Sequence, residues 1–240
     1  LNKIIKNQKI TSVNRKSKFL LISLENHNII LIHLGMTGKV FILKNSSDKI
    51  FKTSFYYTNK INKKHNHLLI DFNKSVRLIY NDVRKFGFIK IIPTSDIKKN
   101  SHLAMLGPEP LSKEFDKNYL IEKSKKAKKN IKSLMMDQKV VSGLGNIYVN
   151  EILYLSSINP TKISNILQNY EINKIIKNTK YILHKAIRLG GSSIKDFRDI
   201  SGKNGNFQQN FMVYDRANEP CKNKKCIGQI KKIYISNRST

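Results

Sequence analysis

Apolar and β-branched residues gather, in the first part of the chain, into short runs that polar residues separate. Runs of about four to eight such residues between polar breaks are typical of β-strands. The first two, Phe19–Leu24 and Asn28–His33, flank the polar residues 25–27, which is a hairpin signal. The same pattern predicts further strands at 39–43, 67–72, 76–80 and 88–92.

From about residue 115 the spacing of apolar residues becomes helical. Pro160 prevents the helix that runs to Leu155 from continuing, and Gly190 and Gly191 end the helix that runs to residue 189. The helices are expected at 118–129, at 131–138, from Asn146 to Leu155, and at 174–189.

Two prolines, Pro108 and Pro110, stiffen the stretch between the two halves. The pattern therefore predicts an α+β chain with several domains. Their expected ranges are 1–105 for a β domain, 106–112 for the linker, 113–200 for a helical domain and 201–240 for a C-terminal segment.

The turn between two of the expected helices has chemistry of its own. Gly143 and Gly145 allow a tight turn, and Asn146 follows as the expected N-cap. A helix start exposes unpaired N–H groups at its positive end, which is a suitable site for a phosphate. The alternative is an ordinary helical hairpin in which these residues serve only the turn.

The chain is strongly basic: 45 Lys and Arg against 16 Asp and Glu give a formal net charge of +29. This surplus favours a polyanionic partner, since each neutralised phosphate releases counterions. The chain is also rich in Lys, Asn and Ile, as proteins from AT-rich genomes are. The sign of the charge is therefore more informative than its size.

Other broad features limit the class of protein. No apolar run reaches the length of a membrane span, and no signal peptide is visible. The only cysteines are Cys221 and Cys226, which argues against a disulfide scaffold and fits a reducing cytoplasm. The first residue is Leu1 rather than Met, so we expect a fragment of a longer protein.

Six motifs in one order closely resemble the formamidopyrimidine-DNA glycosylases, bacterial enzymes that remove oxidised purines such as 8-oxoguanine. They lie at 33–38, at 82–87, at 108–110, at 136–138 leading into 143–151, at 190–197, and at 213–216 followed by 219–221. The resemblance covers nearly every residue. It implies an N-terminal β-sandwich, a helical helix–two-turn–helix domain and a truncated C-terminal zinc-finger hairpin. It also implies a monomer that binds damaged double-stranded DNA at the bacterial nucleoid.

A glycosylase must take its target base out of the stack, and something must fill the hole. By resemblance the void-filling residues are Met36, Arg84 and Phe86. Met36 is a flexible apolar wedge, Phe86 can stack on a base, and Arg84 can satisfy the partner base. The family usually has Pro at the position of Val83 and Arg at that of Lys85.

The resemblance also assigns contacts to the DNA backbone. They fall to His65 in the β domain and to Lys128, Lys132 and Asn146 in the helical domain, with Ala127 as an alternative to Lys128.

Two further residues are assigned to the reaction. Lys18 resembles the lysine that contacts the lesion and assists elimination, and Arg238 resembles the finger arginine that grips phosphate beside it. Residues 192–207 resemble the loop that closes over the everted base. There Asn204 and Asn206 replace a family Pro and Tyr, so the lesion preference is expected to differ.

Cys221 and Cys226 have the spacing of a first ligand pair for zinc. Structural zinc takes four ligands, and the resemblance predicts a second cysteine pair shortly after Thr240. One structural ion is therefore expected in the full-length protein, beside a hairpin strand at 230–235.

The family uses an N-terminal proline as nucleophile and a neighbouring glutamate as acid, followed by β- and δ-elimination. Leu1 matches a position well inside the first domain, so neither residue is in this sequence. We expect a bifunctional glycosylase and lyase as the parent protein, and no base excision by these 240 residues alone.

Two alternatives remain. Endonuclease VIII-type enzymes, which act on oxidised pyrimidines, share the helix–two-turn–helix and the finger. They generally lack the void-filling set and the loop at 190–197, so oxidised purines are favoured. The other alternative is a non-enzymatic relative that binds damaged DNA.

Overall fold

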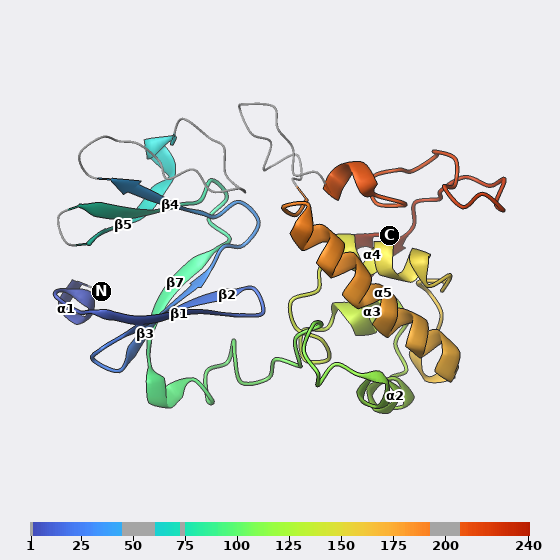
Figure 1. Ribbon diagram of the computed structural model, residues 1–240, viewed down its shortest axis with the longest axis horizontal. Helices are drawn as coiled ribbons and strands as arrows, with labels where there is room; N and C mark the ends of the chain where they lie inside the picture. Colours follow the sequence, from blue (N-terminus) through green and yellow to red (C-terminus); the bar gives the residue numbers. More distant parts are fainter. Residues whose placement is uncertain (1, 45–60, 73–74, 193–206) are drawn as a thin grey trace. The chain divides into compact units, whose positions relative to one another are not determined.

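The computed structural model describes residues 2–44, 61–72, 75–192 and 207–240, which belong to two compact units (Figure 1). One unit comprises Leu1–Asn100 and, among the described residues that follow α5, residues 190–192. The other comprises Ser101–Leu189 with Phe207–Thr240. In the described ranges, no helix is both long enough and apolar enough to cross a membrane.

The first unit consists of two antiparallel sheets, after a short helix α1 (Asn2–Ile5). One sheet has the order β1-β2-β3-β7, and the other has the order β4-β6-β5. The strands are β1 (Ile10–Lys16), β2 (Phe19–Leu24), β3 (Asn28–His33), β4 (Lys39–Lys44), β5 (Asn66–Phe72), β6 (Val76–Asn81) and β7 (Phe88–Pro93). Short 3-10 helices are η1 (Lys63–His65) and η2 (Thr94–Asp96).

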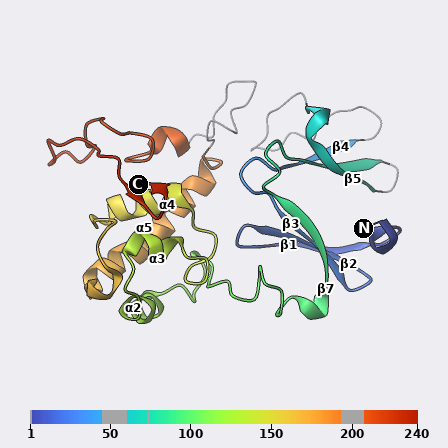
Figure 2. The same cartoon turned by 180° about the vertical axis from the view of Figure 1, so that it is seen from behind.

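The core of this unit lies between the two sheets, which face each other in both views (Figures 1 and 2). Ile22 and Ile32 from one sheet are buried in the same cluster as Leu78 and Tyr80 from the other. Burial of apolar surface between two sheet faces is what stabilises a sandwich. The expected β-sandwich is therefore confirmed.

The predicted strands agree with the observed ones to within one residue at each end. Strand β1 was not predicted. Only Ser12 among its seven residues is half-buried, and Val13 is exposed, so the strand has no buried apolar alternation. It forms at the edge of the sheet because its backbone pairs with β2 from Ile10 to Lys16.

The second unit is helical around one apolar core. In α5 the residues Ile172, Ile175, Ile182 and Ala186 recur on one face and are buried. The helices are α2 (Lys117–Lys125), α3 (Ile131–Met136), α4 (Asn146–Leu155) and α5 (Asn169–Arg188), with 3-10 turns η3 (Ser164–Ile166) and η5 (Phe207–Asn210).

Three helix boundaries differ from the prediction by more than one residue. Helix α3 ends at Met136 rather than at residue 138, because the backbone of Asp137 is extended. Helix α2 ends at Lys125 rather than at residue 129, because Asn130 must be extended to cap α3 with its side-chain oxygen. Helix α5 begins five residues early. Its start is stabilised by the Glu171 carboxylate, which accepts a hydrogen bond from the Gln168 N–H at 2.8 Å.

The C-terminal segment ends in a small hairpin of β8 (Tyr234–Ile235) and β9 (Arg238–Ser239). Ser236 and Asn237, in the turn, have φ values of 49° and 57°. Of the strand expected at 230–235, the last two residues form β8, and Ile233 before them exchanges backbone hydrogen bonds with Thr240 at 3.1 and 2.9 Å.

Glu151 on α4 fixes the start of this segment. The side chain is buried, with 1% of the residue exposed, and accepts three backbone hydrogen bonds. The donors are the N–H groups of Met212 at 2.8 Å, Val213 at 3.0 Å and Tyr214 at 2.8 Å. Oε2 accepts the first of these bonds and Oε1 the other two, so both oxygens of the side chain must be acceptors.

Glu151→Gln is therefore expected to lower the free energy of unfolding by about 1–3 kcal/mol, because an amide NH₂ replaces one acceptor oxygen. Thermal unfolding and proteolysis within residues 207–220 measure the effect. Glu122→Gln is the matched control, since Glu122 is exposed and its ion pair with Lys126 is screened by solvent. Equal effects of the two substitutions would contradict the anchoring role.

Candidate nucleic-acid interface

In the first unit the strand register brings the predicted residues to one end of the sandwich. Phe19 pairs with His33, and His33 pairs with Phe88. The turn before β2, the loop after β3 and the loop before β7 therefore meet at this end. These segments carry, respectively, Lys18, residues 34–38 and residues 82–87.

The three residues predicted to fill the void are all exposed here. Met36 is 49% and Phe86 56% exposed, which is unusual for large apolar side chains close together. The Arg84 guanidinium carbon lies 4.7 Å from the centre of the Phe86 ring, a cation–π contact. The structure thus brings Arg84 and Phe86 together, with Met36 on the adjoining loop.

The two loops approach each other too closely for a side chain between them. Gly35 has φ +62°, and a Cβ there would lie 2.6 Å from the Gly87 nitrogen. A Cβ on Gly87 would lie 2.1 Å from the Tyr80 hydroxyl and 2.5 Å from the His33 carbonyl oxygen. Glycine is required at both positions because the backbones themselves are in contact.

A buried carboxylate joins the same loops. Asp82 accepts hydrogen bonds from the hydroxyls of Thr37, at 2.5 Å, and Tyr80, at 3.1 Å. It also accepts from the backbone N–H groups of Arg84, at 3.3 Å, and Gly87, at 2.9 Å. The prediction from sequence gave Asp82, Thr37 and Tyr80 no role.

Electrostatics agree with this geometry. Burial opposes the charge of Asp82, but its hydrogen bonds, the largest from Thr37, hold the pKa of the carboxyl below its usual value. Burial and the neighbouring Asp82 raise the pKa of Tyr80 to about 12. Tyr80 is therefore a neutral hydroxyl donor and Asp82 an ionised acceptor at neutral pH.

Lys18 and His65 lie at this end as well. Lys18 is exposed in the turn between β1 and β2, next to Ser17, which has φ 56°. His65 ends η1, is half-buried, and accepts a hydrogen bond from the Asp82 N–H at its carbonyl, at 3.0 Å. Val83 and Lys85, which depart from the family pattern, are both exposed on the loop with Arg84.

In the second unit, three side chains converge on the carbonyl oxygen of Ser239. It accepts from Lys132 Nζ at 3.1 Å, from Asn146 Nδ2 at 2.8 Å and from Asn150 Nδ2 at 3.4 Å. The Lys132 ammonium also donates to the Thr240 hydroxyl. Helices α3 and α4 thus hold the β8–β9 hairpin.

This arrangement changes the expected role of Lys132. Only 1% of Lys132 is exposed, and its ammonium is used by the hairpin rather than presented to solvent. Burial, and then the charge of Arg238, lower the pKa of Lys132 to about 8. Sequence position alone did not reveal this, because Ser239 is 107 residues away.

The structure also corrects two details of the phosphate cradle. Gly145, not Asn146, is the N-cap of α4, and no side chain caps the helix. Asn146 is instead the first helical residue, and its amide reaches Ser239. Lys128 is exposed, but it lies in the loop between α2 and α3 rather than on a helix.

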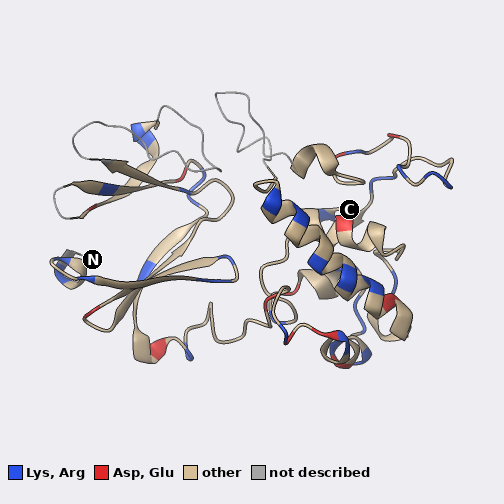
Figure 3. Cartoon of the chain, viewed as in Figure 1, with Lys and Arg blue, Asp and Glu red and all other residues tan. Residues whose placement is uncertain are grey.

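Cationic side chains also lie on the hairpin and on α5. Arg238 is exposed at the start of β9, on the hairpin that the Lys132 and Asn146 side chains hold. Figure 3 shows Lys and Arg along α5 and few acidic residues among the described parts of the chain. An uncapped helix start beside exposed cations is suited to bind phosphate.

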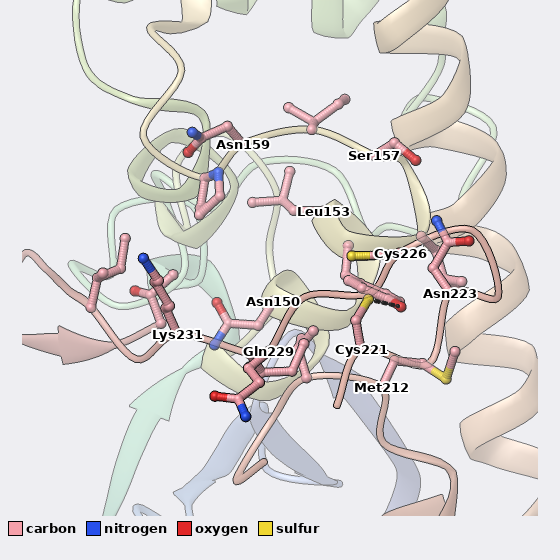
Figure 4. A pocket seen from close by; sticks show the side chains of 18 residues that line it. Asn150, Leu153, Ser157, Asn159, Met212, Cys221, Asn223, Cys226, Gln229 and Lys231 are labelled. Atoms are coloured by element: carbon pink, nitrogen blue, oxygen red, sulfur yellow. Dashed lines mark hydrogen bonds between the residues drawn. The ribbon is translucent and has the colours of Figure 1, made fainter. Parts of the chain in front are cut away.

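The two cysteines line a cavity of about 700 Å³ between α4 and the C-terminal segment (Figure 4). The Tyr154 hydroxyl lies 3.3 Å from Cys221 Sγ. The Tyr154 contact, followed by the Asn223 backbone, lowers the pKa of the Cys221 thiol. Neighbouring thiols of this kind fit one half of a zinc site.

Within the described ranges, no group of three or more His, Cys, Asp or Glu side chains is arranged to hold a metal. The predicted lesion loop, with Asn204 and Asn206, falls at 193–206 and so outside the described residues.

Models of two protein families match the chain. The formamidopyrimidine-DNA glycosylase N-terminal domain matches residues 1–89, and the formamidopyrimidine-DNA glycosylase H2TH domain matches residues 106–198.

Individual proteins match over almost the whole chain. The formamidopyrimidine-DNA glycosylase of Bradyrhizobium sp. (strain BTAi1) is 36% identical over 99% of this chain and 83% of its own length. That of Roseobacter denitrificans is 35% identical over 97% and 81%. A crystal structure of the Lactococcus lactis enzyme, bound non-covalently to DNA containing an AP site, is 34% identical. Its TM-score is 0.81, and the match covers 99% of this chain and 81% of that one.

A second Lactococcus lactis structure, a complex with DNA containing FAPY-dG, also has a TM-score of 0.81 and 34% identity, over 99% of this chain and 82% of that one. The order of the motifs, the sandwich, the helical unit and these matches agree. The chain belongs to the formamidopyrimidine-DNA glycosylase family.

Proposed function

We propose that this protein is a DNA glycosylase of base-excision repair that removes oxidised purines, such as 8-oxoguanine and formamidopyrimidines. The observation that carries the proposal is the group of exposed side chains at one end of the sandwich, Met36, Arg84 and Phe86, on two loops in backbone contact. The solved relatives, which include complexes with DNA containing FAPY-dG and 8-oxo-G, support it.

Each member of this group has a distinct part in the proposed reaction. Met36 enters the space left by the everted base, since a flexible thioether side chain adapts to an irregular apolar hole. Phe86 stacks on the neighbouring base. Arg84 donates to the polar edge of the base that has lost its partner, because that edge would otherwise be unpaired.

The second unit supplies the grip on the DNA backbone in this proposal. The start of α4 and the exposed Arg238 bind phosphate. The exposed Lys128 ammonium adds to the positive electrostatic potential that attracts the DNA backbone. Lys132 acts differently: its buried ammonium holds the hairpin that carries Arg238. Phosphate contacts of this kind fix the register on the duplex without reading its sequence.

We also propose an AP lyase activity for the full-length protein. In the family chemistry an amine attacks C1′ of the deoxyribose and expels the base, and the Schiff base formed then permits β- and δ-elimination. By resemblance the amine is that of an N-terminal proline, and Lys18 contacts the lesion. The exposed position of Lys18, at the same end as the void-filling loops, supports that assignment.

Zinc is proposed as a structural ion, with the thiolates of Cys221 and Cys226 as two of its four ligands. The ion would cross-link the C-terminal segment close to α4. It supplies stability there and takes no part in the reaction.

Met36→Ala in the full-length protein is expected to reduce excision of 8-oxoguanine about tenfold or more, while binding to undamaged duplex changes little. Loss of a buried Met side chain removes about 1.5–3 kcal/mol from the everted state alone. Single-turnover excision and titration with undamaged duplex measure the two effects, and fluorescence of a base analogue at the target position reports eversion.

Met105→Ala is the matched control, because Met105 is also an exposed methionine, 60% exposed, but lies in the other unit. Equal eversion by the Met36→Ala variant and the unmodified protein would show that Met36 is not the wedge.

Lys18→Ala is expected to slow release of 8-oxoguanine much more than it slows nicking at a preformed abasic site, since no base remains to be contacted there. Borohydride trapping on both substrates measures this. An ordinary lysine titrates near 10.4 and an α-amine near 8, so the α-amine is the better nucleophile at neutral pH. Because Lys18→Ala leaves the α-amine in place, trapping on abasic DNA should persist. Lys16→Ala, two residues away on β1, serves as control. Loss of all trapping with Lys18→Ala would instead make Lys18 the nucleophile.

The full-length protein is expected to contain one zinc ion. Cys221→Ser or Cys226→Ser should reduce the metal content well below one equivalent and lower the melting temperature, because a structural zinc site needs all four ligands. Metal analysis of the purified protein decides this. Lys224→Ala, at an exposed residue between the two cysteines, should leave the zinc in place. An unchanged zinc content in both serine variants would refute the assignment.

A further inference from the structure

We infer that Asp82 is the positioning residue for lesion recognition, holding the loop of Met36 and the loop of Arg84 and Phe86 as one rigid body. The inference rests on the proposed function, since it concerns how the void-filling side chains are presented to DNA. Asp82 itself is 0% exposed and does not reach the DNA.

The two oxygens of the carboxylate divide the donors between the loops. Oδ1 accepts from the Thr37 hydroxyl, next to Met36, and from the Arg84 N–H. Oδ2 accepts from the Gly87 N–H, next to Phe86, and from the Tyr80 hydroxyl at the end of β6. Each void-filling residue is therefore bonded to Asp82 directly or through its neighbour in sequence.

The side chain must be a carboxylate to do this. All four partners donate, and an asparagine would turn an NH₂ group toward two of them. The Thr37 hydroxyl has a second function, because it also accepts from the Arg84 N–H at 3.1 Å. Thr37 and Asp82 are 45 residues apart in sequence, so this contact is what joins the loops.

The backbone of Asp82 is held as firmly as its side chain. Its N–H donates to the His65 carbonyl at 3.0 Å, and its carbonyl lies 2.7 Å from His67 Nε2. The carboxylate is thus fixed to β5 and β6 and cannot follow a loop that moves away.

Such an anchor matters because three side chains from two loops must fill one hole in the DNA. If the loops moved independently, ordering them on binding would weaken the complex at the lesion. Two loops that are already anchored to each other avoid this cost of ordering. The gain in affinity applies only where a base has been removed or everted, because only there do the three side chains enter the DNA. Binding to an intact duplex does not use it.

The test compares Thr37→Val with Thr37→Ser. Valine has nearly the shape of threonine but lacks the hydroxyl, whereas serine keeps the donor and acceptor. For each variant, the Kd is measured for a duplex with a stable tetrahydrofuran abasic site and for the same duplex without it. A base analogue opposite the site reports insertion of the void-filling residues.

Thr37→Val is expected to lower the preference for the abasic duplex roughly tenfold, as loss of a charge-assisted hydrogen bond does, and to reduce the insertion signal. Thr37→Ser should retain both. Asp82→Asn should resemble Thr37→Val or exceed it. Circular dichroism and the melting temperature identify any variant that fails to fold. If Asp82→Asn fails to fold, the comparison of Thr37→Val with Thr37→Ser tests the inference.

Unchanged preference and insertion in folded Thr37→Val protein would overturn the inference. An equal loss of affinity for both duplexes would overturn it too, because it would indicate a role in stability only. Failure of the unmodified protein to prefer the abasic duplex is a distinct result: it removes the proposed function, and this inference with it.

Discussion

In the first unit, a single ionised carboxylate and two glycines hold together the loops that follow β3 and β6. The Asp82 carboxylate is costly to bury, and only its four donors compensate for the lost water. Those donors lie on both loops and on β6, so the charge is stable only when the loops are in this arrangement. The exposed side chains of Met36 and Phe86 lie on the two loops that Asp82 holds in place.

The strands were predictable because each half-buried strand carries a visible alternation or run of apolar residues. Strand β1 was not, since it is an exposed edge strand that forms by pairing with β2. Helix ends were less predictable than helix positions. The early start of α5 depends on the bond between Glu171 and Gln168, which apolar spacing does not report.

For the candidate site, the order of the motifs was sufficient to indicate the family, and it pointed to the exposed residues that we propose fill the void. It did not indicate which residues act through others. Lys132 and Asn146 carry groups that bind phosphate in many proteins, yet here both donate to Ser239, a contact set by chain folding. Asp82 stood within a motif but had no role until Thr37, far away in sequence, was placed against it.

The contact of Gly35 with the backbone at Gly87 has a consequence for motion. Backbone segments without room for a Cβ between them cannot slide or rotate past each other without breaking close packing. Adaptation to different bases must then come from side-chain rotamers, which for exposed groups such as Met36 change in picoseconds to nanoseconds. Side-chain movements at this end of the sandwich can therefore be fast while the backbone of both loops stays in place.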